Sequence, residues 1–225
     1  MPPEERFVVR FAAEPPQELV PRGRWAETLQ AEFLSACLHL DDDAEEGELI
    51  GEVGELNYHP DRTWAGRTYV PITARTTTGL DVFGYVSYVP ADPESEDAAE
   101  REPSGFHATA DFTDETAENN PEWKLDLCDE VIGGWRGEHG RVAAMTLVWG
   151  VALRGGGHMV TAELADLAVD QCALVEQRFT LIAPDNYKSD FLEIHLWDSR
   201  GAEIARESLY EEDDEEDDEE ADEEG

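Results

Sequence analysis

The chain has 225 residues and a net charge of −38, from 54 acidic and 16 basic side chains. This excess disfavours direct binding to nucleic acids and to anionic membrane surfaces, because proteins normally bind these through clustered lysine and arginine. The length allows one large all-β domain or two small domains, and either could bury a substantial core.

The first expected elements are a strand and a helix. Residues 6–12 (RFVVRFA) are rich in β-forming residues and are followed by prolines. Apolar residues of the segment WAETLQAEFLSACLHL, which begins at Trp25, share one helical face. We therefore predict a helix near residues 25–36, whereas apolar alternation over residues 34–40 leaves a strand open for its last part.

The middle of the chain predicts a hairpin followed by a polar segment. Residues 67–89 contain two β-branched and aromatic runs separated by TTTGLD. Residues 91–105 are rich in Pro, Ser and acids, which indicates a linker or a long surface loop and a candidate domain boundary. On this division, residues 1–90 and 106–210 form two β-rich halves.

The second half continues in short strands. The glycine-rich segment RGGGH, residues 154–158, is interpreted as a hairpin turn between two apolar strands. FLEIHLW and AEIARESLY, joined by DSRG, form the clearest hairpin. The expected fold is mainly β, with α+β possible: an antiparallel β-sandwich-like body with one or two helices and a disordered acidic tail at residues 211–225.

Neither the amino-terminal segment nor the apolar runs indicate export. The amino-terminal apolar run is short and interrupted by Arg10. The longest nearly uninterrupted apolar stretch, residues 142–153, is twelve residues long, whereas a membrane-spanning helix needs about 20. The three cysteines form no C-x-x-C pair and are expected to be small buried hydrophobes. We therefore expect a cytoplasmic protein.

No motif predicts catalysis, a cofactor or a metal. The chain lacks both glycine-rich nucleotide-binding patterns and a G-x-S-x-G elbow. Its six histidines lack the spacing of metal sites and are expected to be solvated or to lie on strand faces. The acidic loop after Leu40 fits an EF-hand in neither register. Catalytic, cofactor and metal residues are therefore each predicted as none.

The acidic tail suggests a binding function. Of the 14 residues from Glu211 to Glu224, 13 are acidic, and the remaining body still carries −25. Such a run cannot bury apolar surface, but it can engage a basic surface on a protein partner or simply keep the chain soluble. Two tryptophans in polar surroundings could be anchors, although such residues more often close the edge of a core. The predicted partner-binding residues are Trp64, Trp135, Glu211, Glu212, Asp213, Asp214, Glu215, Glu216, Asp217 and Asp218.

The leading hypothesis is a non-enzymatic protein-interaction module, adaptor or chaperone-like, with a basic protein partner. One alternative is an acidic inhibitor, immunity protein or nucleic-acid mimic, which would present acids in two regular rows on one face. Another is a structural subunit with a solubilising tail, and the oligomeric state stays open. An enzyme assembled from distant residues would instead require a pocket in which histidine and carboxylate groups converge.

Overall fold

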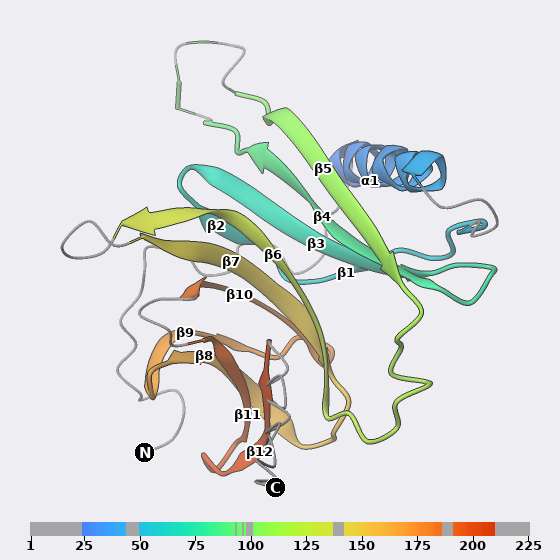
Figure 1. Ribbon diagram of the computed structural model, residues 1–225. Coiled ribbons are helices and arrows are strands. Elements are labelled where there is room, and N and C mark those ends of the chain that lie inside the picture. Colours follow the sequence, from blue (N-terminus) through green and yellow to red (C-terminus); the bar gives the residue numbers. More distant parts are fainter. Residues whose placement is uncertain are drawn as a thin grey trace, which may run out of the picture.

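The computed structural model describes residues 24–43, 50–92, 94–95, 97, 101–136, 142–185 and 191–209. Over these residues the chain is mainly antiparallel β-structure with one α-helix, stacked in four layers (Figure 1). A helix covers a first sheet, the first sheet covers a central sheet, and an outer sheet lies beneath the central one. The mainly β, sandwich-like fold expected from the sequence is confirmed.

The strands divide into three sheets. The first sheet contains β1 (Asn57–Tyr58), β2 (Arg62–Trp64), β3 (Arg67–Arg75), β4 (Asp81–Val89) and β5 (Ser104–Thr113). The central sheet contains β6 (Leu125–Arg136), β7 (Val142–Ala152) and β10 (Arg178–Asp185), in the order β10-β7-β6. The outer sheet contains β8 (Gly157–Leu164), β9 (Leu167–Ala173), β11 (Glu193–Asp198) and β12 (Glu203–Ser208), in the order β12-β11-β8-β9.

The helix α1 (Arg24–Asp43) is longer than predicted and shows no change to strand. Its side chains Leu29, Phe33 and Cys37 recur every four residues and are buried against the first sheet. The alternating apolar positions that suggested a strand do not share one environment, since Leu38 is 70% exposed. The helical period therefore decides the structure of the whole segment.

The first sheet contains the predicted hairpin. β3 and β4 pair from Thr68 and Tyr88 to Arg75 and Asp81, and the turn contains Gly79 at φ 91°. Residues 91–105 then connect β4 to β5, which is the next strand of the same sheet. The polar segment thus joins two adjacent strands of the first sheet, and the chain passes to the central sheet only after β5.

The central sheet is covered on both faces. Trp149 and Leu147 of β7 pack toward the first sheet, whereas Val148 packs toward the outer sheet together with Leu181 of β10. A strand buried on both faces reads as a continuous apolar run rather than an alternating one. This explains the long apolar stretch at residues 142–153.

The outer sheet confirms one prediction and corrects another. β11 and β12 form the predicted hairpin, with Gly201 at φ 82° in its turn. The interpretation of RGGGH as a hairpin turn was wrong, because β7 pairs only with β6 and β10, whereas β8 pairs with β9 and β11. The segment instead carries the chain from the central sheet to the outer sheet.

Two predicted segments lie outside the described residues: the strand at residues 6–12 and the acidic tail at residues 211–225. Among the residues that the structure describes, no helix has the length and apolar character needed to cross a membrane.

Candidate functional site

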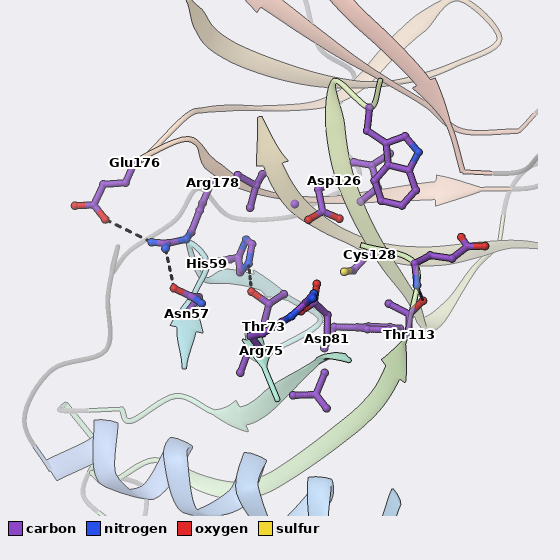
Figure 2. A pocket seen from close by; sticks show the side chains of 18 residues that line it. Asn57, His59, Thr73, Arg75, Asp81, Thr113, Asp126, Cys128, Glu176 and Arg178 are labelled. Atoms are coloured by element: carbon purple, nitrogen blue, oxygen red, sulfur yellow. Dashed lines mark hydrogen bonds and ion pairs between the residues drawn. The ribbon is translucent and has the colours of Figure 1, made fainter. Parts of the chain in front are cut away.

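A pocket of about 440 Å³ lies at one end of the interface between the first and central sheets (Figure 2). The first sheet contributes polar side chains at the end of β3 and the start of β4, and the central sheet contributes β6, β7 and β10. The Glu176, Arg178 and Asn57 group lies on one side of the pocket, and Asp126 and Cys128 lie on the other. Residues distant in the sequence therefore meet here.

His59 is the most deeply buried polar group of this pocket. It follows β1, where Pro60 interrupts the edge strand before β2 begins, and its backbone N–H donates to the carbonyl of Pro71 at 3.0 Å. The side chain is 1% exposed. Burial, assisted by the positive charge of Arg178, lowers the pKa of His59 from 6.5 to about 3. The imidazole is therefore neutral at pH 7.

The two ring nitrogens of His59 differ in their contacts. Nε2 lies 3.3 Å from Oγ1 of Thr73. Nδ1 is buried and has no hydrogen-bond partner among the described residues. The backbone of Gly150 and Phe179 weakly favours the charged ring, but neither reaches hydrogen-bonding geometry with Nδ1. A buried polar atom of this kind is uncommon and costs stability.

Both arginines of the pocket are engaged by oxygen atoms. Arg75 lies 3.0 Å from Asp81 and 3.4 Å from Glu118. Arg178 donates to Oδ1 of Asn57 at 3.0 Å and lies 3.5 Å from Glu176. Neither guanidinium group is therefore an open anion-binding group.

Asp126 differs from the two arginines, because it has a carboxylate rather than an opposite charge as its neighbour. Burial, together with the negative charge of Asp81, raises its pKa. No cation of the described residues is among the groups that shift it. The neighbouring thiol of Cys128 also has a raised pKa, because of burial first and then Asp126. This cysteine is consequently a protonated thiol at neutral pH and a weak nucleophile.

Further carboxylates continue from the pocket along the free edges of two sheets. β5 and β6 are edge strands of the first and central sheets over the described residues. Asp129 and Glu130 are exposed at the surface, but partial desolvation raises the pKa of both, assisted by Asp185 for Asp129 and by Asp129 and Asp111 for Glu130. We define the acidic strip by five residues, namely Asp81, Asp111, Asp126, Asp129 and Glu130.

The structure places the two predicted tryptophan anchors at the other end of this interface. Trp64 and Trp135 are both half-buried and pack against the same apolar cluster between the first and central sheets. A Cβ atom at Gly133 would lie 2.7 Å from the ring of Trp64, so the glycine accommodates that ring. The eight predicted tail residues lie outside the described residues.

Cys37 and Cys172 are buried, as the sequence indicated, whereas Cys128 is partly exposed and lines the pocket. All three are free. Burial raises the pKa of Cys37 to about 11 and that of Cys172 to about 12. Within the described parts of the chain, no group of three or more His, Cys, Asp or Glu side chains could hold a metal ion.

Sequence reasoning missed His59 and Asp126 as site residues. Neither belongs to a recognisable motif, and they are 67 positions apart in the sequence. The one local signal is the proline after His59, which marks an interrupted edge strand. No protein-family model, curated protein or solved structure matches the chain.

Proposed function

We propose that this chain is a non-enzymatic, cytoplasmic protein-interaction module that binds a basic surface of a protein partner. The observation that carries the proposal is the acidic strip. Asp126, Asp129 and Glu130 lie on one edge strand and repel other carboxylates, and no described cation acts on any of the three. A lysine- or arginine-rich surface would relieve this repulsion on binding.

The chemistry of the strip favours a protein partner over a polyanion. Its carboxylates and the body charge of −25 repel nucleic acid and anionic lipid. The tail at residues 211–225 would add a second, loosely specific attraction to the same kind of partner, which salt would screen. Specificity would then come from the body, with Trp64 and Trp135 as proposed anchors at the opposite end of the interface.

The inhibitor or nucleic-acid-mimic alternative fits the strip less well. Successive residues of a strand point to opposite faces. Asp126 and Glu130 therefore lie on the face toward the first sheet, together with Cys128, whereas Asp129 lies on the opposite face. A mimic would be expected to present its acids in regular rows on one face.

The test is capture of partners from the native lysate at low and at near-physiological salt, with identification by mass spectrometry. Four baits are compared: the full chain, a chain ending at Tyr210, D129N/E130Q, and the control D166N/E55Q, whose two acids are exposed and outside the strip. We expect one defined basic protein to survive higher salt with the full chain and the control. D129N/E130Q should no longer capture this protein. The chain ending at Tyr210 should bind it more weakly than the full chain does, with the largest difference at low salt.

The opposite result is equally clear. If D129N/E130Q retains the same protein as the control at both salt concentrations, the strip is not the binding surface. If capture disappears with the tail alone, and the captured material is a mixture of basic proteins, the acidic segments act as a solubility device.

A second candidate function is an enzyme, because His59 and Asp126 line one pocket. General acid–base catalysis works best when the catalytic pKa lies near the working pH. The pKa of His59, at about 3, makes it a weak base at neutral pH. We therefore place binding before catalysis.

A further inference from the structure

The hydrogen bonds inside the pocket are incomplete at His59. If Nε2 accepts from the hydroxyl of Thr73, Nδ1 carries the ring proton and needs an acceptor; if Nε2 donates, Nδ1 needs a donor. In both tautomers Nδ1 stays without a partner among the described residues, although the side chain is 1% exposed. Because Nδ1 is enclosed by protein, the imidazole offers the pocket a neutral wall rather than a free polar atom.

The charges lining the pocket are also unbalanced. Four carboxylates line it, against two guanidinium groups, while His59 is neutral, which leaves a net charge of −2. Both guanidinium groups already contact carboxylates or an amide oxygen. Asp81 is already paired with Arg75, whereas Asp126 has no cation among the groups that shift its pKa, so an incoming cation would gain most from Asp126. An incoming anion would meet repulsion.

Apolar side chains form the remaining wall. Val82, Phe83, Trp123, Leu127 and Val151 line the same pocket. An apolar body would bury its surface here, and aromatic rings also attract cations. The volume of about 440 Å³ is in the range of small-molecule sites, roughly 300–1,000 Å³.

We propose that this pocket binds a small organic cation, a primary amine on an apolar body, with its ammonium group at the Asp126 carboxylate. The inference rests on a carboxylate without a cationic partner, an excess of acidic side chains and an apolar wall in one cavity. The pocket shares Asp81 and Asp126 with the acidic strip, but the two proposals can fail separately, because the test for the protein partner changes Asp129 and Glu130, which do not line the pocket.

The primary test is calorimetric titration of the full chain with phenethylamine, with 2-phenylethanol as the neutral analogue and phenylacetate as the anionic one. We expect binding of the amine only. D126N should weaken it at least about tenfold, because a charge-assisted hydrogen bond is lost. The control D166N removes an exposed carboxylate from the turn between β8 and β9 and should change affinity by less than about twofold.

We expect D126N to fold normally, because replacing the carboxylate by an amide removes a repulsion with Asp81 rather than a favourable contact. A loss of affinity in D126N therefore reports on the binding site. Equal affinity for D126N and D166N, absence of amine binding, or preferred binding of phenylacetate would each overturn the proposal. A lysine side chain of a protein offers the same ammonium group. Binding of N-acetyl-lysine methylamide at least as tight as that of phenethylamine would assign the site to a protein partner instead.

Discussion

At the residue scale, His59 shows how position in the fold overrides residue type. A histidine between two edge strands is ordinarily solvated, but the central sheet covers this one. The folded chain therefore holds a neutral imidazole that the unfolded chain would protonate near pH 6.5. This difference makes folding stability depend on pH.

We predict that His59 makes the chain acid-sensitive between pH 6.5 and about 3. Its pKa is lower in the folded state, so the unfolded state binds the proton first and stability falls as the pH falls. The loss between pH 7.5 and pH 5 should be about 2 kcal/mol, at about 1.4 kcal/mol per pKa unit. Urea unfolding of the native chain and of H59N at both pH values measures it.

H59N should lose less stability over this interval than the native chain, whatever its stability at pH 7.5. The raised pKa values of Asp126, Asp129 and Glu130 act in the opposite direction, because the folded state binds those protons first. They are present in both chains and cancel in the comparison. Equal pH dependence of the two chains would mean that His59 is not shielded from protonation.

At the element scale, the sequence predicted those hairpins whose turns contain glycine. β3–β4 and β11–β12 were found because TTTGLD and DSRG carry the usual turn signals. The turns within residues 159–184 carry no such signal, because Ala165, Asp166, Glu176 and Gln177 adopt positive φ without glycine or asparagine. Strand pairs with such turns, and sheets that stack through long-range contacts, leave little local signal.

One ion pair connects all three sheets. Arg62 of β2 lies 2.7 Å from Asp170 of β9, with side chains 2% and 4% exposed, and it also donates to the carbonyl of Thr180 in β10 at 3.0 Å. Asp170 in turn accepts from the backbone N–H of Ile182 at 2.9 Å. Nothing in the sequence around Arg62 marks it as buried.

We predict that R62M destabilises the fold by about 3–5 kcal/mol, because Asp170 is left as an unpaired buried charge. The double variant R62M/D170L should recover most of this loss, since an apolar pair of similar volume needs no counter-ion. R75M is the matched control: its pair with Asp81 has the arginine 43% exposed and should contribute about 1 kcal/mol or less. A loss for R62M no larger than that for R75M, in urea unfolding, would contradict this assignment.

At the scale of the whole molecule, the four layers depend on one another. The inner face of the first sheet, with Tyr69 and Tyr85, is buried only by packing on Met145 and Trp149 of the central sheet. The central sheet has a second face that the outer sheet must cover. The division into residues 1–90 and 106–210 stays a prediction, but either half alone would expose a large apolar face to water.

We therefore predict one cooperative unfolding transition for all three sheets, which hydrogen exchange with mass spectrometry in increasing urea can follow. Peptides from β3 and β4 in the first sheet and from β8 and β11 in the outer sheet should lose protection at the same urea concentration. R62M should move both transitions together, because its buried partner lies in the outer sheet. Protection of β8 and β11 that outlasts that of β3 and β4 would instead show that the first sheet unfolds independently of the other two. The acidic strip would then lie on a hinge between them, since Asp81 and Asp111 belong to the first sheet and Asp126, Asp129 and Glu130 to the central one.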